Sequence, residues 1–316
     1  MSTARCGLRA FVIVAMLAML AMEDYGIPPP TYRLPDRTRL GAVRLQVRNL
    51  ARSVEYYERV LGLGQLAMVR DAVGLGAEGE DQPLVWLHEL PDARPVPHGG
   101  RLGLYHFALL VPDRASLGRF VRHLGDLGEY AGSADHAVSE ALYLSDPDGL
   151  GIEVYADRPR AGWRVEGRQL YMTTERLNIR DLLAAAGPPP WTGMPAGTVI
   201  GHVHLHVGDL DRAAGFYHQG LGLDKIVWSY PGALFLSAGG YHHHLGTNTW
   251  SSGPPATDED ARLLSWTVVL PSAADVEAAA RSLESAGYAV TRDDAAVTAA
   301  DPWGTRVRID TEQVGS

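Results

Sequence analysis

Cysteine is nearly absent from this chain, which contains a single one, Cys6, among 316 residues. One cysteine cannot form an intramolecular disulfide, and it excludes a zinc finger built on cysteine ligands. Clustered positive charge is also lacking, since 28 lysines and arginines stand against 37 aspartates and glutamates, for a net charge of −9. Because phosphate binding needs a basic surface, we expect no nucleic-acid partner. Histidine is plentiful, with 12 residues, so any metal site must use histidine and carboxylate ligands.

The N-terminus carries an apolar run, residues 11–22, behind Arg5 and Arg9. The run is too short to span a bilayer as a helix, which needs about 20 residues. Three interpretations stay open: a misread start with translation from Met22, a signal or anchor, and an ordinary helix. We interpret residues 1–37 as a leader without a core of its own, and we expect a cytoplasmic enzyme, or an exported or anchored one if residues 5–22 are a real signal.

The rest of the chain repeats itself. The segment GAVRLQVRNL at residues 41–50 is echoed by GHVHLHVGDL at residues 201–210, and a helix-type segment ending in Leu-Gly-Leu follows both. A second echo relates residues 105–112 to residues 265–271, each followed by a helix-type segment and later by an Asp-Pro-x-Gly turn. An alternating strand, an amphipathic helix and further strands, repeated four times, predict an α+β fold of four βαβββ modules.

Four modules in two halves predict the domain organisation. Modules 1 and 2 would form a first domain at residues 38–157, and modules 3 and 4 a second domain at residues 198–311. Residues 158–197 would form a linker with one helix that ends before Pro188–Pro190, and residues 312–316 a tail. Two domains also agree with a chain of this length, at about 150 residues per domain.

The modules resemble the vicinal oxygen chelate superfamily, which includes glyoxalases, bleomycin-resistance proteins and type I extradiol dioxygenases. The similarity covers about residues 38–311. Residues 105–109, 134–149 and 240–246 are similar to segments of the bacterial two-domain catechol 2,3-dioxygenases. The resemblance implies two glyoxalase/bleomycin-resistance-type domains and a metal-dependent reaction.

In this superfamily the first strand of a module can offer one metal ligand and the last strand another. Carried over to this sequence, those places hold three suitable side chains: His106 and Glu153 in module 2, and His202 in module 3. The corresponding places in modules 1 and 4 hold Ala42, Ser265 and Arg308, which suit no divalent cation. Only a pairing of module 2 with module 3, and of 1 with 4, completes the set. The resemblance therefore implies non-haem Fe(II), with Mn(II) as the alternative, on two imidazoles and one carboxylate.

Three further residues carry over as candidates that act on the substrate. His243 aligns with the family's proton-carrying histidine, a role that suits an imidazole because its pKa lies near neutrality. The alternative role for His243 is that of a fourth metal ligand. If this segment forms a strand, the His243 side chain would point away from those of His242 and His244. Tyr143, ten residues before Glu153, has the spacing of the family's substrate-binding tyrosine. His136 resembles the second pocket histidine after a shift of two residues.

Each of these candidates also has an ordinary interpretation. Tyr143 could be a strand aromatic of the core, and His136 could be a loop histidine. His204 and His206 share a strand face with His202 and are expected to line the site or to support its ligands from behind. The choice between His202 and His204, and that among His242, His243 and His244, stays open. Phe107 and Trp250 would join Tyr143 as aromatic walls for a planar ring.

The expected function is an extradiol ring-cleaving dioxygenase that inserts O2 into a catechol-type substrate at Fe(II). The alternatives are a metal-dependent isomerase or lyase of glyoxalase type, whose sites usually use four protein ligands, and a non-catalytic binding protein. The expected partners are a small aromatic diol and O2, with no membrane for the mature domain. The oligomeric state stays open, and a homo-oligomer is compatible with the sequence.

Overall fold

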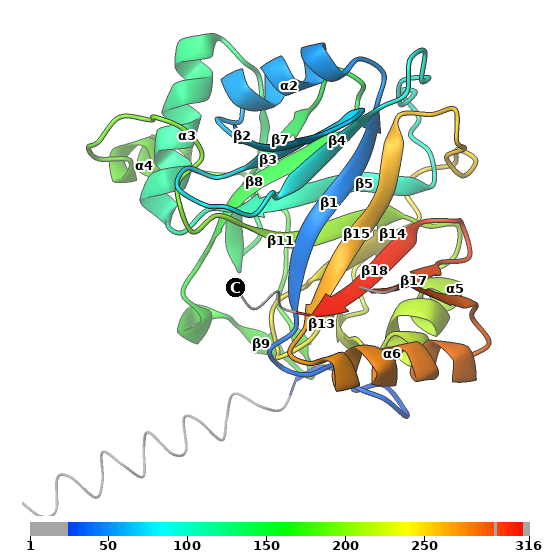
Figure 1. Cartoon of the computed structure of the whole chain (residues 1–316). Helices are drawn as coiled ribbons and strands as arrows, with labels where there is room; N and C mark the ends of the chain where they lie inside the picture. The colour runs from blue at the N-terminus through cyan, green and yellow to red at the C-terminus, as the bar shows by residue number, and fades with distance from the viewer. Residues whose placement is uncertain (1–24, 294–295, 312–316) are drawn as a thin grey trace, which may run out of the picture.

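The computed structural model describes residues 25–293 and 296–311, which form two eight-stranded mixed sheets with helices at either end (Figure 1). Residues 11–22 lie outside the described part, and so does the tail at residues 312–316. The choice between a misread start and a signal, and with it the cytoplasmic location, therefore stays a prediction. Within the described ranges, no helix is both long and apolar enough to cross a membrane.

Each quarter of the chain forms one βαβββ module, as the repeats predict. Module 1 contains β1 (Arg39–Val47), α2 (Leu50–Arg59), β2 (Gly64–Val69), β3 (Ala72–Gly76) and β4 (Val85–Glu89). Module 2 contains β5 (Gly103–Leu110), α3 (Arg114–Leu127), β6 (Gly132–Asp135), β7 (Ser139–Ser145) and β8 (Gly151–Asp157). Module 3 contains β11 (Val199–His206), α5 (Leu210–Ala214), the π-helical turn η2 (Gly215–Gly220), β12 (Asp224–Val227), β13 (Ala233–Ser237) and β14 (Leu245–Asn248). Module 4 contains β15 (Arg262–Leu270), α6 (Ala273–Ser285), β16 (Val290–Arg292), β17 (Val297–Ala300) and β18 (Arg306–Thr311).

The two sheets join modules from different halves of the chain. One, called here the site sheet, has the order β12-β13-β14-β11-β5-β8-β7-β6 and contains modules 3 and 2. The other, called the second sheet, has the order β16-β17-β18-β15-β1-β4-β3-β2 and contains modules 4 and 1. The joints are antiparallel pairs, β11 with β5 and β15 with β1. This confirms the expected pairing of module 2 with module 3 and of module 1 with module 4.

Side-chain alternation separates a core face from a site face on β5. Phe107 and Leu109 are fully buried in the main core, where the Phe107 ring stacks on Tyr57 of α2 with centroids 6.5 Å apart. His106 and Ala108 point to the opposite face, because successive strand side chains alternate. The expectation that Phe107 is a wall for a substrate ring is therefore wrong.

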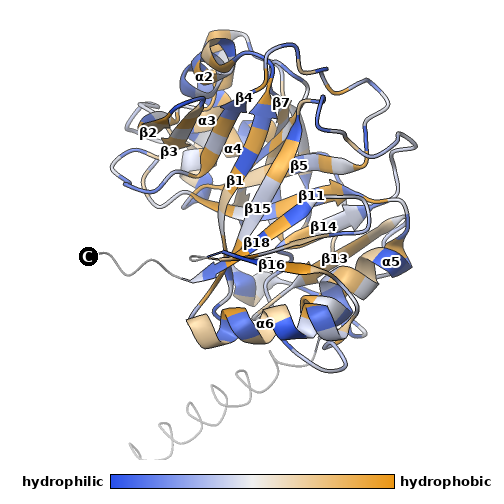
Figure 2. Ribbon diagram, turned by 45° about the vertical axis from the view of Figure 1, so that its right-hand side comes forward, coloured by the Kyte–Doolittle hydropathy of each residue, from blue (hydrophilic) through white to orange (hydrophobic). Residues whose placement is uncertain are grey.

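The longer helices begin and end where the sequence provides caps. In α3 the Asp113 side chain accepts the Ser116 N–H, and Gly128 ends the helix in the left-handed region at φ 70°. In α6 the Ser272 side chain caps the first turn in the same way. The buried residues of α6 recur at helical spacing: Val276, Ala279, Ala280 and Leu283. Figure 2 shows the resulting mixture of hydrophilic and hydrophobic residues along this helix.

The segment before β1 and the segment between β8 and β11 both lie against the modules. Residues 25–38 lie alongside β12, where Ile27 pairs with Lys225 and Arg33 binds Asp224. Leu34 is 1% exposed and belongs to the main core, so this stretch contributes to the core although the sequence suggested a bare leader. The second segment holds the short elements η1 (Arg160–Gly162), β9 (Val165–Glu166), β10 (Gln169–Leu170) and α4 (Ile179–Ala185).

Candidate metal centre

Three neighbouring strands of the site sheet supply the cluster. His106 lies on β5, Glu153 on β8 and His202 on β11, and β5 pairs with both of the others. Glu153 is paired with Ala108, two residues from His106 on the same face of β5, so the pleat directs both side chains to one side. The structure thus brings the three predicted ligands together, from two halves of the chain.

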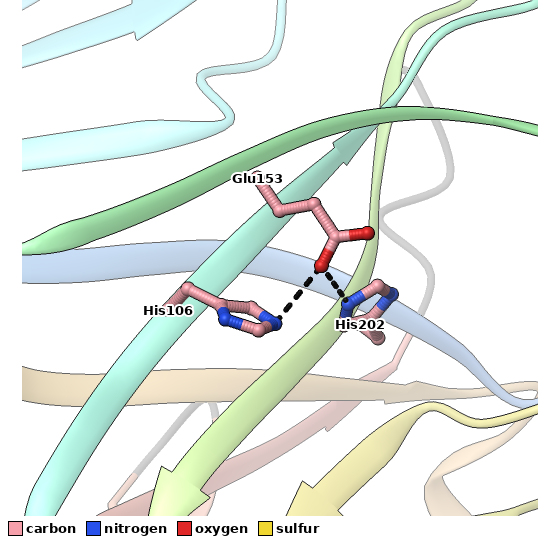
Figure 3. Close-up of side chains that lie close together, drawn as sticks. All are labelled: His106, Glu153 and His202. Carbon is pink, nitrogen blue, oxygen red and sulfur yellow. Dashed lines mark hydrogen bonds and ion pairs between the residues drawn. The ribbon is translucent and has the colours of Figure 1, made fainter. Parts of the chain in front are cut away.

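The three side chains converge on one point (Figure 3). The Nε2 atoms of His106 and His202 each lie 3.0 Å from the same oxygen, Oε2 of Glu153. All three residues are buried, and one ligand atom from each lies within 4.8 Å of the others. Two imidazoles and one carboxylate are therefore held at the separation that a shared cation would bridge.

The electrostatics keep these groups in the forms that bind a cation. Burial alone would raise the pKa of Glu153, but the charge of His202 and the closeness of both imidazole rings hold it well below its ordinary value. Burial lowers the pKa of His106, against the opposing effect of Glu153. An ionised carboxylate and a neutral imidazole are the protonation states of metal ligands.

The hydrogen bonding of the cluster fits a metal ion. Although His106 Nε2 is close to Glu153, it makes no hydrogen bond of normal geometry and is a buried nitrogen without a partner. Such a group in a native fold calls for an explanation, and a bound ion is one. Two histidines and one carboxylate suit non-haem Fe(II) or Mn(II) and leave coordination positions for other ligands.

A cavity of about 560 Å³ adjoins the cluster. His106 and Glu153 line it together with the predicted substrate residues His243, Tyr143 and His136. The aromatic walls are Tyr105, Tyr230, Phe235 and Trp250. Trp250 is thus placed as the sequence suggested, whereas Tyr230 and Phe235 were not singled out. A largely apolar cavity with a few convergent polar groups is typical of a small-molecule site.

The three consecutive histidines, residues 242–244, lie in the turn between β13 and β14 and not in a strand, so the expected strand alternation is wrong. Two successive glycines, Gly239 and Gly240, each with φ 60°, turn the chain before it reaches the histidines. His242 and His243 lie against each other, with their Nδ1 atoms 2.7 Å apart. His243 reaches the cavity, and its ring centroid lies 4.1 Å from that of His202. Burial first, and then the neighbouring histidines, lower the pKa of His243 well below its ordinary value.

Tyr143 and His136 form a hydrogen-bonded pair on the cavity wall. Nε2 of His136 lies 2.6 Å from the Tyr143 hydroxyl, and Nδ1 of His136 lies 2.6 Å from the carbonyl oxygen of Thr173. Because a carbonyl can only accept, Nδ1 carries a proton, and Nε2 of the neutral ring accepts the tyrosine O–H. Burial, and then the charge of Glu153, raise the pKa of Tyr143 well above its ordinary value, so it stays a phenol.

His204 is a wall residue of the cavity, whereas His206 does not line it, and both are held by an asparagine that sequence reasoning missed. His204 lines the cavity, and its Nε2 lies 2.9 Å from Nδ2 of Asn248. His206 Nδ1 lies 2.6 Å from Oδ1 of the same side chain. Asn248 thus fixes both rings at once. No sequence signal marks it, because the contact depends on the pairing of β11 with β14.

Residues 172–174 were also missed as part of the site. Met172, Thr173 and Thr174 line the cavity although they belong to the region expected to be a linker. Glu175 N–H bonds to the carbonyl of Asp135, which ties this stretch to the end of β6. The stretch shows no strand or helix periodicity that could have revealed a wall.

Comparisons with known proteins agree with this architecture. The family model described as the Glyoxalase/Bleomycin resistance protein/Dioxygenase superfamily matches residues 39–154 and 199–309. The chain belongs to this superfamily. A catechol-2,3-dioxygenase from Bacillus subtilis (strain 168) is 44% identical over 270 residues, which cover 84% of this chain and 94% of that protein. The chain is accordingly an enzyme of the superfamily's dioxygenase group, as the sequence resemblance indicated.

Solved structures share the fold at much lower sequence identity. A Bacillus subtilis protein provisionally described as a dioxygenase has a TM-score of 0.63 at 16% identity, covering 90% of this chain and 87% of its own. Glyoxalase I from Zea mays has a TM-score of 0.54 at 17% identity, covering 87% of this chain and 92% of its own. Likeness at this level concerns the fold alone, because one scaffold can host several chemistries.

Proposed function

We propose that the chain is an extradiol ring-cleaving dioxygenase that uses non-haem Fe(II), with Mn(II) as the alternative, held by His106, His202 and Glu153. Its substrates are a catechol-type aromatic diol and O2. The observation that carries this proposal is the convergence of these three side chains beside a cavity that also holds His243, Tyr143 and His136. The relative at 44% identity, described as a catechol-2,3-dioxygenase, supports the same reaction.

The overall reaction balances without another reductant or oxidant. Both atoms of O2 enter the diol, the ring bond beside the two hydroxyl-bearing carbons breaks, and the product is a muconic semialdehyde. The bound metal would act as a Lewis acid that lowers the pKa of the diol's hydroxyls. The remaining tasks belong to the chain's own side chains.

His243 is the residue we assign to proton transfer. Its lowered pKa keeps the ring neutral near pH 7, so it can accept a proton from a substrate hydroxyl and later return it. Tyr143 stays a phenol and orients a substrate oxygen through its hydroxyl, which His136 holds in place. Tyr230, Phe235 and Trp250 enclose the ring and exclude water from it.

The glyoxalase-type alternative calls for a fourth protein ligand. Among the described residues, the cluster contains three ligand-bearing side chains and a single carboxylate. A set of three favours a reaction in which substrate and O2 both need coordination positions. A non-catalytic binding protein would not need three buried ionisable groups to converge, because burying them costs free energy without a compensating partner.

The test is anaerobic reconstitution of metal-depleted full-length protein with Fe(II), and separately with Mn(II). Catechol and ring-substituted catechols are then added, followed by O2. We expect one O2 consumed per diol and a yellow ring-cleavage product, and the active metal identifies the cofactor. Stoichiometric metal binding without O2 uptake on any diol would overturn the proposal. A glyoxalase substrate, the hemithioacetal of methylglyoxal and glutathione, tests the alternative in the same preparation.

A further inference from the structure

A hydrogen-bonded chain of side chains lies behind His243, on the side away from the cavity. Its members come from the β13–β14 turn and from the end of β8. We propose that Asp157 and His242 are positioning residues that fix the tautomer of His243, so that its Nε2 faces the cavity as a free proton acceptor. The catalytic use of this nitrogen rests on the proposed function, whereas the tautomer itself can be tested without it.

The contacts run in one direction from a carboxylate to the cavity wall. Asp157 Oδ1 lies 2.9 Å from Nε2 of His242. Nδ1 of His242 lies 2.7 Å from Nδ1 of His243, and His243 lines the cavity. Within residues 25–293 and 296–311, no protein group is hydrogen-bonded to Nε2 of His243, which leaves this atom for a ligand in the cavity.

Hydrogen-bond donors and acceptors along this chain can be assigned from the carboxylate inward. An ionised carboxylate only accepts, so Nε2 of His242 carries the proton. In a neutral His242 the other nitrogen, Nδ1, then has a lone pair and must accept. His243 therefore donates from Nδ1–H, and its Nε2 carries the free lone pair. A base oriented by a third group is the arrangement that nucleophile and base pairs commonly use.

The hydrogen-bonded chain of Asp157, His242 and His243 is fixed in place by its surroundings. His242 is fully buried, and the ring of Trp163 lies edge-on to it at a centroid distance of 5.4 Å. The Tyr241 hydroxyl donates to Asp157 Oδ1 at 3.2 Å, and the Tyr155 hydroxyl lies 2.7 Å from that of Tyr241. Arg160 also donates to the carbonyls of Gly239 and Gly240 at the start of the turn.

The hydrogen bond between the two rings is the decisive element. Without an acceptor at position 242, a neutral His243 can place its proton on Nε2 as readily as on Nδ1. Each molecule in that second form presents an N–H to the cavity and cannot accept a proton from a substrate. The role of His242 is thus to supply an acceptor, and a side-chain carbonyl of similar reach would replace it.

The test compares His242→Gln, which keeps an acceptor, with His242→Leu, which removes it. In 15N NMR of the full-length, histidine-labelled chain, the His243 resonances are assigned by their loss in His243→Ala. We expect a protonated Nδ1 and a bare Nε2 in the wild type and in His242→Gln, and a mixture of tautomers in His242→Leu. With active enzyme, kcat of His242→Leu should fall about 10- to 100-fold at little-changed KM, with recovery in His242→Gln.

Two further variants keep the proposal falsifiable if His242→Leu does not fold. Asp157→Ala frees His242 from its partner and should also mix the tautomers of His243. Tyr241→Phe keeps the contact between Asp157 and His242 and should leave the tautomer unchanged. A wild-type His243 that carries its proton on Nε2, or a tautomer unaffected by both His242→Leu and Asp157→Ala, would overturn the proposal. Because the NMR readout needs no turnover, a failure of ring cleavage alone leaves this inference standing.

Discussion

The two sheets share one backbone plan but present opposite chemistry. In the site sheet His204 of β11 pairs with His106 of β5, and in the second sheet Arg44 of β1 pairs with Ser265 of β15. On the next strand along, Glu153 pairs with Ala108, and Arg308 pairs with Thr267 in the same manner. Where one sheet gathers histidines and a carboxylate, the other has a hydroxyl and two guanidiniums.

Electrostatics make the second sheet unsuitable for a cation. Burial lowers the pKa of Arg44, and the charge of Arg308 lowers it further, which shows that the two cations feel each other. Arg308 is held by Asp310 and Asp293. The comparison shows that the same strand arrangement occurs in both sheets, and that a few side chains decide which of the two sheets can bind a metal.

The largest expected difference is between two variants, one that lacks a ligand of the site sheet and one that lacks the corresponding residue of the second sheet. His106→Ala should lower metal affinity and ring-cleaving activity by more than about 100-fold, because even residues that only support a ligand contribute 10- to 100-fold. Ser265→Ala should leave both unchanged. Metal content after dialysis and O2 uptake are the measurements. Equal losses in the two variants would mean that the sheets are not chemically distinct.

A narrower effect, on kcat and not on metal content, is expected at the residue that has no counterpart. Leu245 of β14 and Val85 of β4 occupy equivalent places in modules 3 and 1. The residues two positions before them are His243 and Pro83, so module 1 has a proline in the place of His243. His243→Ala should lower kcat by about 10²- to 10⁴-fold while metal content stays constant, because it removes a proton acceptor and no ligand. His88→Ala, on β4 of the second sheet, is the control and should retain full activity. Loss of metal from the His243 variant would instead favour its rival role as a fourth ligand.

The smallest effect concerns a turn that both halves share. Asp146 follows β7 and accepts the backbone N–H groups of Asp148 and Leu150, and burial raises its pKa to about 7. A carboxyl with a raised pKa binds its proton more tightly in the folded state. Its contribution to stability is therefore present at low pH and is lost as pH rises from about 4 to about 7, by up to about 1.4 kcal/mol per pH unit.

Urea unfolding across this pH range measures the effect. The wild type should lose stability with rising pH at a steeper slope than Asp146→Asn, which cannot ionise. Asp301, in the corresponding turn of module 4, also has a pKa raised by burial and provides the matched variant Asp301→Asn. Identical slopes in the wild type and both variants would show that these turns do not couple folding to protonation.

Sequence reasoning worked best where residues recur with a fixed period. The four modules followed from the repeated strands, and the resemblance to the superfamily then marked the places of His106, Glu153 and His202 within them. It failed at Phe107, where the neighbouring His106 should have indicated the opposite face. It also misjudged the run at residues 241–244, because two glycines at positive φ end the strand pattern before the histidines.

The remaining site residues depend on contacts that no local pattern contains. Residues 172–174 become a wall only because the chain between β8 and β11 returns to β6. Asn248 acts through partners on β11 and Asp157 through a partner in the β13–β14 turn, and each looks like an ordinary polar residue in the sequence. Such contacts follow from tertiary packing, which overrides local preference.

The crossed order of the sheets has a consequence for how the protein is made. β1 is the first strand among the described residues, yet its partner β15 lies in the last module, and the cluster itself draws on both halves. During synthesis the first module therefore emerges with an unpaired strand edge. The cluster cannot hold an ion until β11 has been synthesised and has paired with β5. Ion capture would report the closing of the whole polypeptide, and a fragment ending after β8 should neither bind it nor protect its own exposed edge.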